Sequence, residues 1–126
     1  MERQIRVLVA DRLKLMREII IAAFADQPDI EVVGEVQDES EILPWVQQTH
    51  PDFLFIGMED PNRRPLVCDL VLRLHPEVNI IAVGAHSNRT VVYWASYNIH
   101  SSVLESSEEA ILAAVRSKAS LPGAPS

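Results

Sequence analysis

Apolar residues along the chain fall into two kinds of stretch, short continuous runs and segments where they recur every three or four residues. Continuous runs rich in Val and Ile are typical of buried strands, whereas the wider spacing is typical of a helix with one apolar face. The short runs predict strands over residues 5–10, 31–36, 52–57, 79–84 and 101–105. The spaced segments predict helices over residues 12–25, 40–49, 63–74, 88–98 and 107–119.

Strict alternation of strand and helix indicates a parallel sheet with helices on both faces. The runs at 52–57 and 79–84 are apolar throughout, as expected for strands buried on both sides. The pattern therefore predicts a doubly wound α/β sandwich built on a five-stranded parallel sheet.

The length of 126 residues and a hydrophobic content of 48% suit one compact domain. We place this domain at residues 1–119. The closing segment SLPGAPS, residues 120–126, has the small-residue and proline content of a linker or tail.

Composition narrows the classes of function. A net charge of −7 argues against sequence-independent binding of nucleic acid by this domain alone, because such binding depends on Lys and Arg. No apolar run approaches the length of a membrane span, and the N-terminus does not look like a signal peptide, so a cytoplasmic location is expected. The single cysteine, Cys68, lies among apolar residues and is expected to be a small buried hydrophobe. The four histidines lie far apart and predict no metal site.

In an open parallel sheet, ligands bind outside the carboxyl ends of the strands. The candidate site residues are therefore those that end or follow the predicted strands, namely Asp11, Arg12, Gly57, Gly84, His86 and Glu105. The acids Glu59 and Asp60 follow shortly after Gly57, where we interpret them as turn-forming, solvated charges.

Five segments carry a resemblance to a known family. In their order and spacing, RVLVADR, DIEVVGEV, HPDFLFIG, IIAVGAHS and VLESSEEAILAAV resemble the receiver domain of bacterial response regulators, a flavodoxin-like (βα)5 fold. The resemblance covers residues 4 to about 118 and is strongest to receivers that precede a helix-turn-helix output domain. It implies a site in which two acids hold Mg²⁺, an Asp accepts a phosphoryl group, and a hydroxyl residue and a Lys bind that group.

The chain departs from this pattern at most of the site positions. Asp11 matches the first acid and is the only retained acid of the metal site, but Arg12 replaces the second acid and Gly57 replaces the phospho-acceptor. Gly84 replaces the hydroxyl residue and Glu105 replaces the lysine. A carboxylate nucleophile needs a metal and a cation to offset the charge on the transferred group, so the resemblance implies a degenerate receiver without catalytic residues, metal or cofactor.

Two hypotheses concern the emptied pocket. Arg12 bridges Asp11 and Glu105 as a swapped ion pair; the alternative is that Arg12 points into water, as surface arginines commonly do. Gly57 and Gly84 leave empty volume near which the indole of Trp94 packs; the alternative is a rotated helix with a partly exposed Trp94.

These observations predict a phosphorylation-independent module for protein interaction or dimerisation in signal transduction, and not an enzyme. By resemblance, the interface is the face built from the fourth helix, fifth strand and fifth helix. Tyr93 and Tyr97 are expected on the outer side of residues 88–98, although both rings could instead lie over their own helix. Two alternatives remain open: the N-terminal regulatory domain of a transcription factor whose DNA-binding half is not in this chain, and a phosphorelay receiver with an unconventional acceptor.

Overall fold

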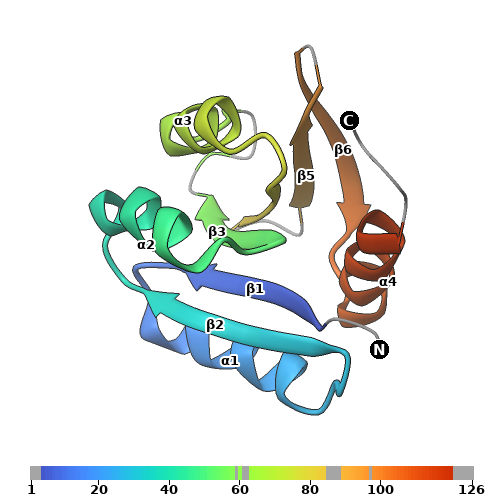
Figure 1. Ribbon diagram of the computed structural model, residues 1–126. Coiled ribbons are helices and arrows are strands. Elements are labelled where there is room, and N and C mark those ends of the chain that lie inside the picture. Colours follow the sequence, from blue (N-terminus) through green and yellow to red (C-terminus); the bar gives the residue numbers. More distant parts are fainter. Residues whose placement is uncertain (1–3, 59, 61–62, 85–88, 97, 121–126) are drawn as a thin grey trace.

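The computed structural model describes residues 4–58, 60, 63–84, 89–96 and 98–120. Within those residues the chain forms one six-stranded sheet with helices on both faces (Figure 1). The strands are β1 (Ile5–Ala10), β2 (Ile30–Val36), β3 (Phe53–Met58), β4 (Asn79–Gly84), β5 (Arg89–Ala95) and β6 (Ile99–Glu105). The helices are α1 (Lys14–Ala25), α2 (Ile42–Thr49), α3 (Leu66–Leu74) and α4 (Glu108–Ser120), and a short 3-10 turn, η1 (Glu39–Glu41), precedes α2.

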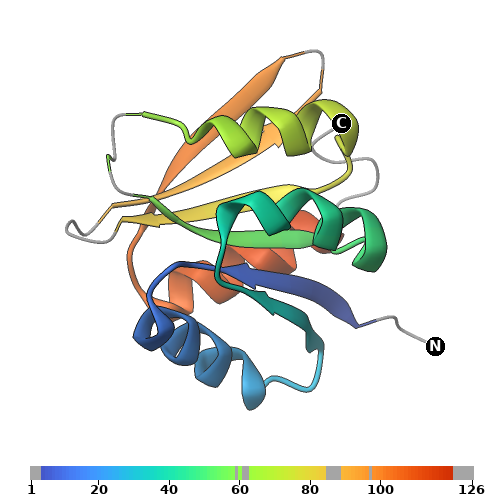
Figure 2. The same cartoon turned by 90° about the vertical axis from the view of Figure 1, so that its left-hand side faces the viewer.

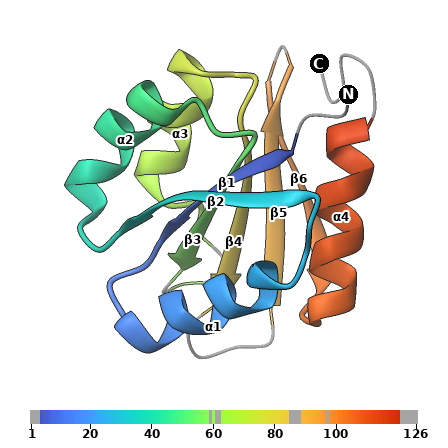
Figure 3. The ribbon, with the colours of Figure 1, turned by 60° about the horizontal axis from the view of Figure 1, so that its bottom comes forward.

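The strand order is β2-β1-β3-β4-β5-β6. The first four strands of this order pair in parallel, whereas β4 with β5 and β5 with β6 pair antiparallel. Helices α2 and α3 cover one face of the sheet and α1 and α4 cover the other, as the two turned views show (Figures 2 and 3). The predicted doubly wound α/β class is therefore confirmed.

The core lies in two layers, one on each face of the central strands. Phe53, Leu54 and Ile80 have no exposed surface, which confirms that β3 and β4 are buried on both sides. On the α1 and α4 face, the rings of Phe24 and Phe55 meet edge to face with centroids 5.0 Å apart. The two apolar layers hold the central strands between the helices, and the carboxyl ends of those strands are where ligands bind in sheets of this kind.

The prediction of a helix over 88–98 is wrong, because residues 89–95 form β5. The segment Thr90-Val91-Val92-Tyr93-Trp94 is made of β-branched and aromatic residues, which fit the pleated surface of a strand better than a helix. β5 pairs along its whole length with β6, from Arg89 opposite Glu105 to Ala95 opposite Ile99. The sheet consequently has six strands instead of the predicted five, and it is mixed instead of all-parallel.

The other boundaries agree with the predictions to within a few residues. Cys68 has no exposed surface, as expected. None of the described helices is long and apolar enough to cross a lipid bilayer. The predicted tail lies at the C-terminal end, where residues 121–126 are outside the described part of the chain, and its linker role stays a prediction.

Candidate functional site

The carboxyl ends of β1 and β3 bring Asp11 and Gly57 together. These two strands pair in parallel with Ala10 opposite Ile56, so the next residue of each, Asp11 and Gly57, lie side by side at the edge of the sheet. A Cβ atom built on Gly57 would lie 2.5 Å from Oδ2 and 2.8 Å from Cγ of Asp11. The carboxylate of Asp11 thus fills the space that a side chain at position 57 would need.

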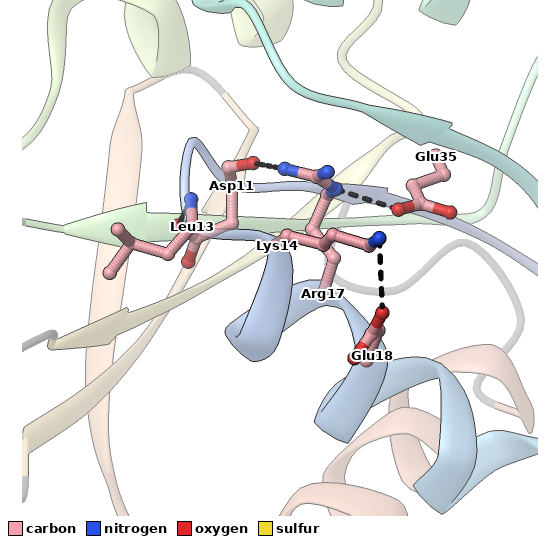
Figure 4. A network of polar contacts seen from close by, with 6 residues as sticks. All are labelled: Asp11, Leu13, Lys14, Arg17, Glu18 and Glu35. Atoms are coloured by element: carbon pink, nitrogen blue, oxygen red, sulfur yellow. Dashed lines mark hydrogen bonds and ion pairs between the residues drawn. The ribbon is translucent and has the colours of Figure 1, made fainter.

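Backbone groups hold Asp11 in this position (Figure 4). Its Oδ1 accepts a hydrogen bond from the backbone N–H of Leu13 at 2.9 Å, which is the geometry of an Asx turn leading into α1. Its own N–H donates to the carbonyl of Val36 at the end of β2, at 3.0 Å. The carboxylate is therefore fixed on the side of β3 by the loop that carries it.

Arg17 of helix α1 also binds the loop that carries Asp11. Its Nη1 donates to the carbonyl oxygen of Asp11 at 2.6 Å, and its Nε donates to Oε1 of Glu35 at 2.7 Å (Figure 4). Arg17 is only 7% exposed, so its charge is stabilised by these two acceptors. Arg17 is not among the residues that the strand ends predict for the site. A charged residue in the apolar stripe of Leu13, Ile20 and Phe24 was the available signal.

A cleft of about 980 Å³ opens beside Asp11 and Gly57. It lies between the loops that follow β1, β2 and β3. The charged residues among its described lining are five acids and three arginines: Asp11, Asp38, Glu39, Glu41, Asp60, Arg12, Arg63 and Arg64. Both signs of charge are present, so the cleft is not built as a dedicated anion site.

Two of the charged groups at this cleft are bound to neighbouring residues. Arg64 forms a two-pronged contact with Asp69, with Nε 2.6 Å from Oδ1 and Nη2 3.2 Å from Oδ2, which holds the pKa of Asp69 below its usual value. Hydrogen bonds from the backbone and side chain of Ser40 lower the pKa of Asp38, so this carboxyl is ionised at neutral pH.

Burial raises the pKa of the nearby Cys68 thiol to about 12, with the charge of Asp69 as the second cause. At neutral pH the sulfur is therefore a protonated thiol and not a nucleophile. Together with its complete burial, this confirms the interpretation of Cys68 as a small core residue.

The predicted site residues that the structure describes do not all converge. Asp11, Arg12 and Gly57 line the cleft, whereas Gly84 and Glu105 are not among its lining residues. Gly84 is buried and pairs with Met58. Glu105 ends β6, directly opposite Arg89 of β5, and the hydroxyls of Thr90 and Ser106 lie 2.8 Å apart beside it.

The predicted bridge from Arg12 to Glu105 is wrong. Three strands, β3, β4 and β5, separate β1 from β6. At about 4.8 Å between neighbouring strands, the strand ends that carry Arg12 and Glu105 are about 19 Å apart, which is too far for an ion pair. The inserted strand β5 is the cause, because it moves Glu105 outward by one strand position.

The hypotheses that Gly57 leaves empty volume and that the indole of Trp94 packs near it are both wrong. The space at Gly57 is filled by Asp11. β5 runs antiparallel to β4, so Trp94 lies near the edge of the sheet opposite to the site, where its ring stacks on His100 with centroids 5.6 Å apart. Trp94 therefore packs away from the truncated strand ends and fixes no helix.

The expected exposed pair of tyrosines is not formed by Tyr93. This residue is 5% exposed and its hydroxyl points to Sδ of Met58 at 3.9 Å, because it faces the core between β5 and α3. Tyr97, Glu59 and His86 lie outside the described residues. Asp60 is exposed at the cleft.

No protein-family model matches the chain. In sequence, the chain is 38% identical over 74 residues to protein-glutamate methylesterase/protein-glutamine glutaminase 1 of Caulobacter vibrioides, covering 58% of this chain and 22% of that protein. It is 32% identical over 85 residues to the corresponding enzyme of Pyrococcus horikoshii, covering 68% and 23%. With the transcriptional regulatory protein DegU of Brevibacillus brevis it shares 26% identity over 93 residues, covering 72% and 39%. The chain thus spans less than a quarter of the first two relatives.

Comparison with solved structures finds receiver domains that are similar to this chain in fold. The response regulator domain of Thermotoga maritima CheB is 31% identical with a TM-score of 0.58, over 66% of this chain and 62% of that one. The signal receiver domain of a response regulator, NarL, from Mycobacterium tuberculosis is 24% identical with a TM-score of 0.60, over 68% and 70%. The chain therefore has the flavodoxin-like fold of response-regulator receiver domains.

Proposed function

We propose that this chain is a receiver-like domain that acts in signal transduction without accepting a phosphoryl group, through contacts with other proteins. The observation that carries the proposal is the position of Asp11, whose carboxylate lies where a side chain on Gly57 would begin. The strand end that resembles the phospho-acceptor position has no nucleophile, and the space for one is occupied by a neighbouring acid.

The rest of the site supports the same conclusion. Phosphoryl transfer to a carboxylate requires charge on the transferred oxygens to be offset by a metal and a cation. By resemblance, a lysine is expected after the last strand, but in this chain the last strand, β6, ends in Glu105. β6 also lies one strand position further from the site than the last strand of a five-stranded sheet would. No cation is supplied from that strand to the edge where Asp11 lies.

The residues at this edge do not fit Mg²⁺, the metal that the resemblance implies. Mg²⁺ prefers octahedral oxygen ligands with one or two carboxylates. One oxygen of Asp11 already accepts the N–H of Leu13, and the adjacent residue is an arginine. Within the described part of the chain, no group of three His, Cys, Asp or Glu residues is arranged to hold a metal ion.

Incubation with acetyl phosphate, and separately with beryllofluoride, in the presence of Mg²⁺ tests the proposal. We expect no phosphoryl adduct by intact mass spectrometry and no Mg²⁺-dependent rise in melting temperature, while a receiver that retains the acceptor Asp shows both under the same conditions. A stoichiometric adduct would overturn the proposal. Mapping it to Asp60 or Glu59 would instead favour a receiver with an unconventional acceptor.

A second candidate function is the N-terminal regulatory domain of a transcription factor. It is favoured by the match to DegU, in which the chain covers 39% of the relative's length, and by solved matches that include a complex of the response regulator RcsB with DNA at 18% identity. The sequence that follows Ser126 in the gene would decide: an encoded helix-turn-helix segment supports this candidate, and its absence contradicts it.

The structure contains different elements at the predicted interaction face. The predicted face of fourth helix, fifth strand and fifth helix does not exist in that form, because the segment expected as the fourth helix is β5. The corresponding elements are β5, β6 and α4, and we propose that this end of the sheet carries the protein contacts.

A further inference from the structure

The strand β6 ends the sheet with an open edge. It is the last strand of the order, and its pairing partner is β5 alone. All seven residues of β6 pair with β5 without a register shift, so the strand has no bulge. Its outer edge therefore carries a row of backbone N–H and C=O groups that pair with no strand among the described residues, and such a row is a template for pairing with another strand.

The opposite edge of the sheet differs. β2 contains two acids, Glu31 and Glu35, and its register with β1 shifts between Val7 and Leu8. Charges and bulges are the common means by which proteins prevent edge-to-edge pairing. β6 has neither in its interior, since its sequence is IHSSVLE and its acid, Glu105, is the last residue. One edge is protected and the other is left open.

The face of β6 beside this edge is also bare. Val103 is 57% exposed, and Ser101, which points to the same face, is exposed as well. Helix α3 contacts β5, and α4 lies over the opposite face, with Leu112 and Val115 in the core beneath it. The helix that the sequence pattern predicted over 88–98 would have added cover to the sheet, but that segment is itself a strand.

We propose that two copies of this chain pair through β6, antiparallel and about a two-fold axis near Ser102, to form one continuous sheet; this rests on the proposed function and names the partner. A two-fold axis needs only one edge that is complementary to itself. With Ser102 opposite its own copy, Ser101 lies opposite Val103, His100 opposite Leu104, and Ile99 opposite Glu105 of the second copy.

The charges of the chain favour the antiparallel direction of this pairing over the parallel one. Two copies that each carry a net charge of −7 repel one another over most of their surfaces. In the antiparallel arrangement no acid of β6 faces an acid of the other copy, because Glu105 stands at one end of each strand. A parallel pairing would place the two Glu105 side chains together, and like charges directly opposite are destabilising.

A second exposed apolar surface lies on α3, but we do not assign the dimer contact to it. Leu66, Leu70 and Leu74 form an exposed stripe on the outer side of α3. The backbone groups of this nine-residue helix are bonded within the helix, so it offers a partner only side chains over about 13 Å, whereas the seven residues of β6 also offer backbone groups over about 23 Å. Dimerisation through this stripe is the competing outcome of the test.

The experiment uses the full chain and two substitutions at the axis. Ser102→Lys places two like charges opposite each other in the dimer, and Gln47→Lys on exposed α2 is the control with the same change in charge. By sedimentation velocity over a range of concentrations, we expect the wild-type chain and Gln47→Lys to dimerise equally and Ser102→Lys to do so about five- to tenfold more weakly. Ser102→Cys is expected to form a disulfide-linked dimer on mild oxidation, and Gln47→Cys is not.

Two results would overturn the pairing. One is a wild-type chain that stays monomeric at all concentrations. The other is a dimer that tolerates Ser102→Lys but is lost on Leu70→Lys, which would assign it to α3. The same experiments distinguish this proposal from the proposed function. If the chain is monomeric and accepts no phosphoryl group, only the pairing through β6 is contradicted. If the chain is phosphorylated and its dimer is weakened by Ser102→Lys, only the phosphorylation-independent function is contradicted.

Discussion

The carboxylate of Asp11 lies where a side chain of residue 57 would extend, with Oδ2 only 2.5 Å from the position of a Cβ on Gly57. The loop after β1 and the end of β3 are therefore matched to each other: the glycine admits the acid, and the acid is held there by the N–H of Leu13. This relationship makes the loss of a side chain at position 57 part of the packing of the site.

Substitution of Gly57 by Ala is expected to destabilise the fold by about 1–3 kcal/mol, because the added methyl group meets the Asp11 carboxylate. Urea unfolding of a double-mutant cycle checks the cause. In the Asp11→Ala background, we expect Gly57→Ala to cost at least about 1 kcal/mol less. Equal costs in both backgrounds would show that the strain at position 57 does not come from Asp11.

Reconstruction of an acceptor should fail even with several changes. We expect neither Gly57→Asp nor the triple variant with Arg12→Asp and Glu105→Lys to gain the mass of a phosphoryl group from acetyl phosphate with Mg²⁺. The physical reason is that β5 moves position 105 outward by about 5 Å, so a lysine there cannot reach the site. A phosphorylated single variant would mean that the pocket is far less disabled than its geometry indicates.

Arg17 should be a larger determinant of stability than its charge suggests. Replacing it by Met keeps the apolar stem but leaves the carbonyl of Asp11 without its donor, and we expect a loss of about 1–3 kcal/mol in the free energy of unfolding. Lys14→Met is the matched control on the same helix, since Lys14 is exposed and makes a 3.8 Å pair with Glu18. For that control we expect at most about 0.5 kcal/mol. Similar losses for both variants would contradict the anchoring role.

The buried thiol of Cys68 is expected to lower the free energy of unfolding at alkaline pH. Its pKa is raised to about 12 in the folded protein, from about 8.5 in an unfolded chain. Between these values the unfolded state has released its proton and the folded state has not, so stability falls as pH rises, by up to about 1.4 kcal/mol per pH unit. We expect Cys68→Val to reduce this slope in urea unfolding measured above pH 9, leaving the smaller contribution of Tyr93, whose pKa burial also raises. An unchanged slope would argue against a buried thiol.

The strand assignment of β5 can be checked in solution. We expect cross-strand nuclear Overhauser contacts between Val91 and Val103, and between Val92 and Ile81, as the register requires. Contacts between residues three apart within 89–95 would instead indicate the helix that the chain pattern first suggested.

The sequence pattern predicted the first two thirds of the fold because its apolar periods were unambiguous there. Residues 88–98 were assigned to a helix mainly by their place in a βα alternation. The local signal pointed the other way, since Val91, Val92, Tyr93 and Trp94 all favour strands and a turn with Ser96 and Asn98 follows. In this segment the composition, and not the alternation of elements, indicates the correct structure.

The site was predicted in part for a similar reason. Strand ends located Asp11, Arg12 and Gly57 correctly at one cleft, because parallel neighbours must end at the same edge. Glu105 was misplaced as a consequence of the missed strand. The filling of the Gly57 space by Asp11 could not be read from the sequence, because it depends on the conformation of a single side chain in a loop.

The hairpin-like arrangement of β4, β5 and β6 has a consequence for how the chain folds. These three strands follow one another along the chain and pair in that order, so their contacts close short loops. The parallel pairs of β1 with β2 and with β3 join residues much further apart, and closing longer loops is slower. We expect the C-terminal meander to form first and to template the rest of the sheet, which higher φ-values at Val92 than at Val7 would show.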